Sequence, residues 1–317
     1  MIQYVYKAGG TAIGLAFLFL LFFSFGCSII TTGQLILPVD TPEAIRLENV
    51  PFFPQKKYEC GPSSLAMALT WSGLAVTPDD LSSQVFTPDL HGSLQASLIS
   101  GARQYGRVAY PIKGSQELVA ELNAAHPVIV LQNLGLSWYP KWHYAVVIGY
   151  KNGGRAVILH SGEKAAEQLS ARVFQNTWAR ADYWGLLVLA PDELPAAVTE
   201  ERYILSVAGL ERARQFDAAI RAYKTALRRW PESMPAWMGL GNSFYAKGDL
   251  PAAANTFKEA IQLQPANGLP LNNLAQVYWD QGKKEEALQT IRHAIDLGGP
   301  FKHIFEETLQ GFEQGEK

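Results

Sequence analysis

The sequence has few of the residues that bind metal ions, with only 2 cysteines and 6 histidines among 317 residues. None of them has the close spacing that zinc sites need, so we expect no metal and no cofactor. The chain also has little net charge, -2, and its basic residues are scattered. Without a basic patch there is no electrostatic reason to expect nucleic acid as a partner. No glycine-rich phosphate-binding loop is present either, so nothing in the sequence suggests an ATPase domain.

The N-terminal segment has almost no charge. No charged residue lies between Lys7 and Asp40, and the run from Ala12 to Phe25 is almost wholly apolar. A charged start followed by a short apolar core is typical of a secretory signal. The small residue Gly26 directly before Cys27 resembles the processing site of bacterial lipoproteins. That resemblance implies that Cys27 is lipidated and becomes the new N-terminus, so that residues 1–27 are signal and anchor.

Two interpretations of this segment stay open. In the first, lipid on Cys27 anchors the protein in the cell envelope, and Ser28 implies by resemblance the periplasmic face of the outer membrane. In the second, an uncleaved helix from Ala12 to Ile30 holds the chain in a membrane. Both predict an exported, membrane-associated protein. We expect residues 28–49 to form a polar, proline-containing tether.

The second cysteine, Cys60, stands before a turn and an apolar helical pattern. Gly61 and Pro62 mark the turn, and Pro62 suits the first turn of a helix, where a missing N–H costs little. A cysteine at a helix N-terminus lies near the positive end of the helix dipole, which favours the nucleophilic thiolate. Gln55, five residues upstream, carries an amide that can donate to a developing oxyanion. The alternative is a small buried residue that only begins a helix.

Helical patterns come first and strand patterns second between residues 50 and 195. The expected helices begin near Cys60, Thr77, Gly92 and Gln116, and the expected strands cover residues 127–131, 143–150, 155–159 and 184–189. An Asn-Gly turn at residues 152–153 joins two of these strands as a hairpin. Helices followed by antiparallel strands predict an α+β domain.

His143 opens the first strand of that hairpin, directly after an aromatic run. Alone it would be a half-buried structural residue. Together with a thiol at a helix start and a glutamine just upstream, it completes the set that a cysteine hydrolase requires. In such an enzyme the histidine accepts the thiol proton and later protonates the leaving amine.

The stretch 50–195 resembles papain-like cysteine peptidases, specifically those that process bacteriocins by cleaving double-glycine leaders. The resemblance rests on Gln55, on the Cys60-Gly-Pro turn with its helix, and on His143-Tyr-Ala-Val-Val before a hairpin. It implies that Gln55 supplies the oxyanion hole, that Cys60 attacks the substrate and that His143 is the base. It also implies an α+β papain-like fold and a peptide or protein substrate.

The third catalytic residue of that family is an aspartate on the second hairpin strand, usually followed by proline. This chain has His160-Ser-Gly at that place. We expect His160 to orient the ring of His143, with Asn133 or Ser161 as alternatives. A histidine brings no fixed negative charge to stabilise an imidazolium, so weak activity or an unusual substrate is expected.

The rest of the chain repeats with a period of 34 residues. Alanine recurs at that spacing at positions 219, 253 and 287, and again at 226, 260 and 294. This pattern resembles tetratricopeptide repeats, with units at about 200–232, 233–266 and 267–300 and a C-terminal capping helix. The resemblance implies a concave groove that binds a protein partner or substrate. We expect four residues to point into it: Asn242, Tyr245, Asn272 and Gln276.

These observations predict a membrane-anchored cysteine peptidase that hydrolyses peptide or related amide bonds through an acyl-enzyme on Cys60. The repeats would recruit a protein partner or the substrate without contributing to the chemistry. Two alternatives stay open. One is a peptidase-like scaffold that has lost its activity with its aspartate, and the other is an acyl transferase that uses the same thiol.

Overall fold

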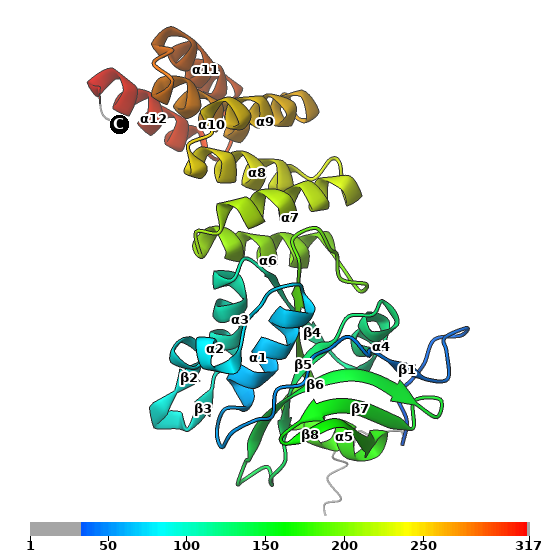
Figure 1. The fold of residues 1–317 in the computed structure, drawn as a ribbon. Coiled ribbons are helices and arrows are strands. Elements are labelled where there is room, and N and C mark those ends of the chain that lie inside the picture. Colours follow the sequence, from blue (N-terminus) through cyan, green and yellow to red (C-terminus); the bar gives the residue numbers. More distant parts are fainter. Residues whose placement is uncertain (1–32, 316–317) are drawn as a thin grey trace, which may run out of the picture. The chain divides into compact units, whose positions relative to one another are not determined.

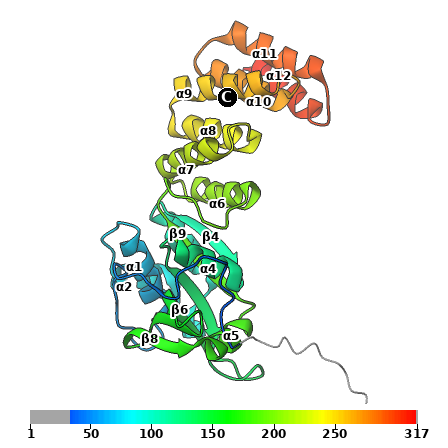
Figure 2. The same cartoon turned by 90° about the vertical axis from the view of Figure 1, so that its right-hand side faces the viewer.

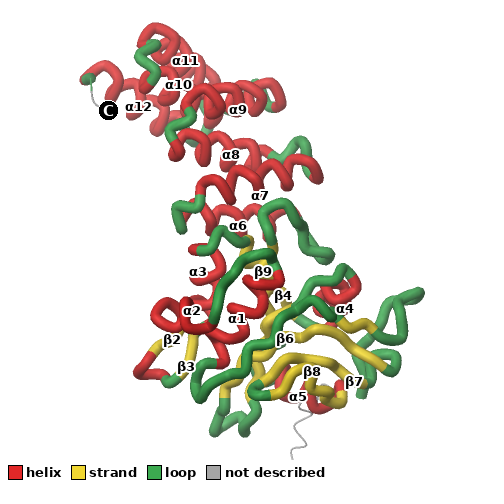
Figure 3. Tube along the Cα trace, viewed as in Figure 1, coloured by secondary structure: helices red, strands yellow, loops and turns green. Residues whose placement is uncertain are grey.

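The structure is a computed structural model, and it describes residues 33–315. The predicted lipidation site Cys27, with the apolar segment before it, lies outside these residues. The described residues belong to one compact unit. In this unit, strands occur only before residue 190 and are followed by an all-helical array (Figure 3). The expected combination of an α/β domain with antiparallel strands and a helical repeat array is confirmed.

One antiparallel sheet organises the first domain (Figure 1). Among the described residues it has seven strands, with the order β4-β9-β5-β6-β7-β8 and with β1 paired to β6. Its strands are β1 Ile45–Arg46, β4 Val108–Lys113, β5 Val128–Asn133, β6 Trp142–Lys151, β7 Ala156–Ser161, β8 Lys164–Ser170 and β9 Trp184–Leu189. A separate small hairpin pairs β2 (Phe86–Thr87) with β3 (Gly92–Ser93).

The helices of this domain are α1 Cys60–Trp71, α2 Pro78–Val85, α3 Gln95–Gln104, α4 Ser115–Asn123 and α5 Ala171–Ala179, with a 3-10 turn at Pro88–Leu90. Every residue of α1 from Gly61 to Leu69 is buried, as expected for a helix that is apolar all round. The start of α2 is fixed by Thr77, whose N–H and hydroxyl both donate to the Asp80 carboxylate.

The four expected strands agree with β5, β6, β7 and β9, while β4, β8 and α5 were not predicted. Strand β4 contains Pro111, and a proline in a sequence argues against a strand because it has no N–H to donate. Here β4 is the edge strand of the sheet, where the missing donor is tolerated. Strand β8 is a half-exposed edge strand with little apolar alternation, and α5 has only 9 residues. Neither carries a strong periodic signal.

Residues 33–49 do not form the expected tether. Leu35 is fully buried, and its N–H donates to the carbonyl of Gly154 at 2.7 Å. Strand β1 pairs with β6, and the N–H of Leu47 donates to Ile148 at 2.8 Å. The prediction was wrong for this stretch because its isolated apolar residues, Leu35, Leu47 and Val50, each enter the core of the domain.

The array consists of three helix pairs and a final helix, stacked one after another (Figure 2). The pairs are α6 Glu200–Arg212 with α7 Phe216–Arg229, α8 Met234–Lys247 with α9 Leu250–Leu263, and α10 Gly268–Asp280 with α11 Lys284–Leu297, followed by α12 Lys302–Gln314. All six periodic alanines are buried. Small residues also let rings pack closely, since a Cβ at Gly239 would lie 2.2 Å from the ring of Tyr223.

The first repeat shares its core with the sheet domain. Tyr203, Val207 and Leu210 of α6 belong to the same buried cluster as the strands, whereas the outer repeats have two clusters of their own. The guanidinium of Arg202 donates to both carboxylate oxygens of Glu117, at 2.8 and 2.9 Å, and to the carbonyl of Pro111. The opening helix of the first unit departs from the repeat pattern because one of its faces packs against β4.

Candidate active site

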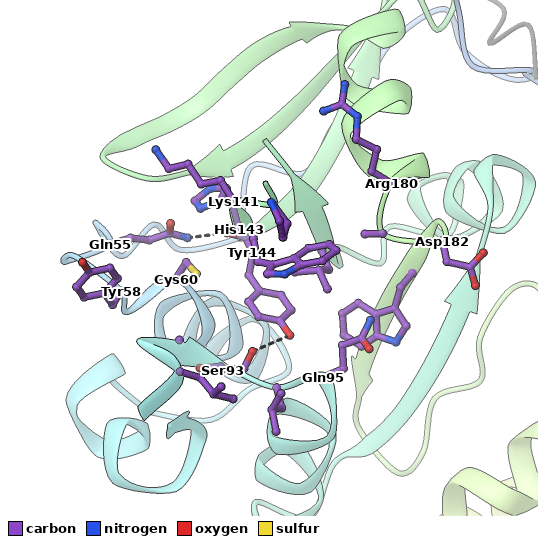
Figure 4. A pocket seen from close by; sticks show the side chains of 18 of the residues that line it. Gln55, Tyr58, Cys60, Ser93, Gln95, Lys141, His143, Tyr144, Arg180 and Asp182 are labelled. Carbon is purple, nitrogen blue, oxygen red and sulfur yellow. Dashed lines mark hydrogen bonds between the residues drawn. The ribbon is translucent and has the colours of Figure 1, made fainter. Parts of the chain in front are cut away.

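A cleft of about 1550 Å³ opens in the sheet domain, and its wall brings together Gln55, Cys60 and His143 (Figure 4). These residues come from the loop before α1, from the first residue of α1 and from the start of β6. Three segments that are far apart in sequence therefore supply the three residues that the sequence singled out. Among residues 33–315 no group of three His, Cys, Asp or Glu side chains could hold a metal ion.

Cys60 begins α1, and its thiol is free. Burial raises the pKa of this thiol, and backbone hydrogen bonds from Tyr144, Gly61 and Cys60 itself lower it by less. The net direction is opposite to the one that the helix dipole alone suggests. Burial therefore favours the protonated thiol over the thiolate at this position.

His143 is held by a neutral hydroxyl. Its Nε2 lies 2.9 Å from Oγ of Ser161 at the end of β7. When Nε2–H donates to this oxygen, Nδ1 carries the lone pair and can accept a proton. Burial lowers the pKa of His143, Lys141 lowers it further and Glu167 raises it slightly. Burial therefore favours the neutral imidazole, the form that can accept a proton.

His160 is not in contact with His143, so the expected orienting role is wrong for this residue. The Nε2 of His160 lies 3.2 Å from the carbonyl of Val50, and its Nδ1 accepts from the N–H of Ala166 at 3.0 Å. Its ring packs at 5.2 Å from that of Phe52. Both ring nitrogens are thus engaged elsewhere, and the histidine holds the N-terminal loop against the hairpin.

A β-bulge explains why Ser161 takes the place that His160 was expected to fill. The β6–β7 register shifts between Val147 and Gly149, after which Val146 lies opposite His160. Residues directly opposite in a ladder share a face, so His160 points to the face that carries Val146 and not His143. Continuing the register puts Ser161 opposite Ala145, on the same face as His143. One extra residue in β6 therefore exchanges the two candidates.

Gln55 is buried, and its amide is fully used. Its Nε2 donates to the carbonyl of Tyr144 at 3.1 Å and to Oγ of Ser64 at 3.3 Å, and its Oε1 accepts from the N–H of Gly162 at 3.0 Å. No amide hydrogen is left to donate to an oxyanion in this resting geometry. The contacts instead tie the loop before α1 to the strand that carries His143 and to the turn after Ser161.

The far wall of the cleft is charged and reaches α6. Arg202 lines the cleft together with its partner Glu117, and Lys113 does so with its partner Asp182. The guanidinium of Arg202 also lies 4.8 Å from the ring centre of Tyr110. No sequence pattern predicts that a residue of the repeats lines the cleft. The first repeat helix nevertheless contributes part of its wall.

The four residues predicted to line a groove lie on α8 and α10 and belong to two separate hydrogen-bonded groups. In the first group, Asn273 donates to Asn242 at 2.9 Å and accepts from Asn272 at 3.3 Å. In the second group, Tyr245 and Gln276 both donate to Asp280. Burial, with Asp280 beside it, raises the pKa of Tyr245 to about 12. The structure therefore brings Asn242 near Asn272 and Tyr245 near Gln276, with Asn242 exposed and the other three half-buried.

A sheet domain with a cleft is joined to a helical repeat array. Comparison with known proteins identifies families that each part resembles. Residues 47–184 match the family described as Peptidase_C39 like, and residues 209–268 and 244–297 match two tetratricopeptide repeat families. The sheet domain is therefore similar to C39-like peptidases, and the array is similar to tetratricopeptide repeats.

Individual relatives are more distant. The chain is 27% identical to Superkiller protein 3 of Saccharomyces cerevisiae over 128 residues. This aligned stretch covers 40% of this chain and 8% of that protein. It spans between 8% and 16% of the length of the curated relatives that it matches. A Bacillus anthracis structure described as a C39-like peptidase is 20% identical, covers 47% of this chain and 98% of its own, and has a TM-score of 0.41. A structure of the Yersinia enterocolitica type III secretion translocator chaperone SycD is 16% identical. The match covers 37% of this chain and 93% of the SycD chain, with a TM-score of 0.35.

Proposed function

We propose that this protein is a cysteine peptidase that hydrolyses peptide or related amide bonds through an acyl-enzyme on Cys60. The observation that carries the proposal is one cleft that holds a thiol at a helix N-terminus and an imidazole whose far nitrogen is bonded to Ser161. The C39-like family match of residues 47–184 supports it.

Starting from a neutral Cys60 thiol and a neutral His143 imidazole, hydrolysis would proceed in the following order. Nδ1 of His143 takes the thiol proton as the sulfur of Cys60 adds to the substrate carbonyl carbon. The oxygen of the resulting tetrahedral species is negative, and N–H groups at the start of α1 can donate to it. The imidazolium then protonates the leaving amine as the C–N bond breaks. Water, deprotonated by the same histidine, next attacks the thioester and releases the acid and the thiol.

The test is capture of the acyl-enzyme. The purified protein is mixed with activated esters of short peptides and with a peptidyl acyloxymethyl ketone, and intact mass and peptide mapping locate the adduct. We expect one adduct on Cys60 that is absent from Cys60→Ala and strongly reduced in His143→Ala. Cys60→Ala should keep the wild-type unfolding midpoint. No adduct on folded wild-type protein would refute the proposal.

A second candidate function follows from the neutral partner of His143. Ser161 cannot stabilise an imidazolium as a carboxylate does, which favours weak chemistry or a peptidase-like scaffold. Acyl transfer to an amine is the remaining alternative. The adduct experiment separates these outcomes: a scaffold forms no adduct, a hydrolase loses its adduct to water, and a transferase loses it faster when an amine is added.

For the repeats, we propose recruitment of a protein partner or substrate through the two hydrogen-bonded polar groups on α8 and α10. The repeat family matches support a protein-binding role, and amide groups that lie side by side can pair with the backbone of an extended peptide. Asn242→Ala with Asn272→Ala should weaken partner capture and leave peptide ester turnover unchanged. Unchanged capture would assign the array to spacing.

We further propose that the chain is exported and anchored to a membrane through lipid on Cys27. The apolar run before Gly26 supports this proposal. Metabolic labelling with a fatty acid should mark the wild-type protein and not Cys27→Ser, which should also leave the membrane fraction. If Cys27→Ser stays membrane-bound, the uncleaved helix is the anchor. Among the helices of residues 33–315, none is long and apolar enough to cross a bilayer.

A further inference from the structure

Large apolar side chains project from the loop between β5 and β6. We call residues 134–142 the aromatic loop. The side chain of Trp138 is 81% exposed and that of Tyr139 74%, and Leu134, Leu136 and Trp142 are exposed as well. Soluble proteins rarely expose apolar residues in such a cluster, so the cluster marks a contact surface.

The aromatic loop is held firmly from below. Oδ1 of Asn133 accepts from the N–H groups of Gly135 and Lys141, both at 2.9 Å, and Leu136 and Tyr139 exchange backbone hydrogen bonds at 3.1 Å. Arg180 donates to the carbonyls of Asn133 and Gly135, at 3.0 and 2.6 Å. A loop with this many bonds displays its aromatic rings in a fixed arrangement, which lowers the entropy cost of binding.

The catalytic cleft does not account for this exposure. Only the end of the loop, Pro140 to Trp142, lines the cleft, whereas Leu134, Leu136, Trp138 and Tyr139 do not. Asn133, one alternative for orienting His143, is occupied with shaping the loop. The four apolar residues outside the cleft are therefore available for a different contact.

The described chain begins close to the base of this loop. The carbonyl of Gln34 accepts from Gln175 in α5, and Arg180, which supports the loop, caps the same helix. Gln175 and Arg180 are about 8 Å apart along the helix axis at 1.5 Å per residue. Leu35 is fixed in the core of the domain. In the sequence, only nine residues lie between Phe25, where the apolar run ends, and Leu35.

We propose that the aromatic loop rests on a lipid surface and holds the mouth of the cleft against it. Tryptophan and tyrosine rings favour the boundary between head groups and acyl chains. Lys141 and Arg180 add positive charge beside the rings, which suits anionic head groups. Cys27, which carries the proposed lipid anchor, is eight positions before Leu35 in the sequence, so the proposed anchor and this loop would reach the same membrane. The proposal does not depend on peptidase activity.

Because Thr31–Lys317 is a compact unit of its own, a chain of residues 31–317 tests the loop without the apolar run. Its binding is measured by co-sedimentation with vesicles of phosphatidylethanolamine and phosphatidylglycerol. We expect binding that falls about tenfold or more in Trp138→Ser with Tyr139→Ser, because two buried rings are lost from the interface. The matched control, Leu205→Ser with Leu263→Ser, removes two exposed leucines from the array and should bind as wild type does.

A second measurement uses vesicles with brominated acyl chains, which quench tryptophan at the level of the chains. Fluorescence of residues 31–317 should fall in these vesicles, and Trp138→Phe should recover part of the signal. Absence of vesicle binding by residues 31–317, or equal binding by the loop variant, would overturn the proposal. So would a loop variant that binds vesicles normally but has a raised KM for a soluble peptide, since the loop would then bind substrate.

Discussion

The cleft of the sheet domain and the polar residues of α8 and α10 are built by contacts of very different range. In the array, Asn273 bonds to Asn242, 31 residues away, because each helix pair stacks on the next. In the cleft, Gln55 bonds to Tyr144 and Gly162, which are 89 and 107 residues away. Local stacking makes the polar contacts of the array modular, whereas the cleft depends on strand register and on loops that must meet correctly.

The two regions are nevertheless continuous at α6. This helix is the first of the array, yet Tyr203 lies in the core of the sheet domain and Arg202 lines the cleft. The array is therefore modular only beyond α8, whose Ala236 and Leu240 still belong to the core shared with the sheet domain. This difference determines which changes should affect the chemistry and which should affect only the array.

The largest effect is expected from removing the whole array. A chain that ends before Tyr203 loses α6 and α7 and uncovers core residues of the sheet domain. Losing a large buried side chain costs about 3–5 kcal/mol, and several go at once, against a total stability of about 5–15 kcal/mol. We expect this chain to lack a cooperative unfolding transition and all turnover, which circular dichroism and ester hydrolysis would show.

The matched truncation ends after Gln264 and removes only α10 to α12. The residues that it uncovers belong to the outer clusters, so the sheet domain should stay folded and hydrolyse a small peptide ester at close to the wild-type rate. If the chain that ends before Tyr203 folds and hydrolyses the same ester normally, the array is modular throughout. The packing of α6 against the sheet domain would then contribute little to stability.

The next largest effect is expected for Gln55→Ala, which breaks the tie between the loop before α1 and β6. The carbonyl of Tyr144 and the N–H of Gly162 would lose their partner, at about 1–3 kcal/mol for each buried group. We expect turnover to fall about 10²-fold, since His143 is next to Tyr144, and the free energy of unfolding to fall as well. Steady-state kinetics and urea unfolding measure the two.

Gln175→Ala is the control for Gln55→Ala, because it removes another buried glutamine, whose amide donates to the carbonyl of Gln34 away from the cleft residues. It should lower stability and leave turnover unchanged. A Gln55→Ala variant with wild-type stability and a loss confined to kcat would restore Gln55 as an oxyanion donor, with its amide released when substrate binds.

A smaller effect separates Ser161 from its neighbour His160. Ser161→Ala removes the hydrogen bond to Nε2 of His143, and a bond of this kind contributes about 1 kcal/mol, so kcat/KM should fall up to about tenfold. Ser161→Asp should raise kcat/KM, since a carboxylate stabilises the imidazolium. His160→Ala should lower stability without changing the pH dependence, because its ring bonds only to Val50 and Ala166. The reverse pattern would mean that the bulge in β6 is absent in solution.

Ser161 and His160 differ in a feature that depends on strand register, whereas the repeats and the start of α1 have local sequence signals. The period of 34 predicted the helix pairs and the buried alanines, because in a repeat every position has a neighbour at a fixed spacing. The cysteine, glutamine and histidine were found because a helix start and a strand start are local signals. A bulge has no such signal here, and a single extra residue in β6 changes which β6 residues lie opposite Leu159 and His160. The sequence therefore limits the residue that orients His143 to His160, Asn133 or Ser161, but it does not distinguish among these three.

The loops before α1 were predicted least well, for a related physical reason. Leu35 and Leu47 are isolated apolar residues in a polar stretch, and only the finished sheet provides a place to bury them. In the same way, the amide of Gln55 was expected to face the substrate, because its competing partners, Tyr144 and Gly162, are distant in sequence. Long-range partners decide both outcomes, and sequence patterns report mainly near ones.

The smallest expected effect is on the pH dependence, and it distinguishes a neutral resting pair from a thiolate–imidazolium pair. Burial lowers the pKa of His143 and raises that of Cys60. Catalysis that starts from neutral imidazole and thiol fails only when His143 becomes protonated. The acid limb of kcat/KM should therefore lie below the ~6.5 of free histidine. Alkylation of Cys60 by iodoacetamide should be slow at pH 6 and accelerate only above the ~8.5 of free cysteine. Ser161→Asp adds a carboxylate beside Nε2, which should raise the pKa of His143 and move the acid limb upward. Fast alkylation at pH 6 that is lost in His143→Ala would instead establish an ion pair and contradict the direction argued from burial.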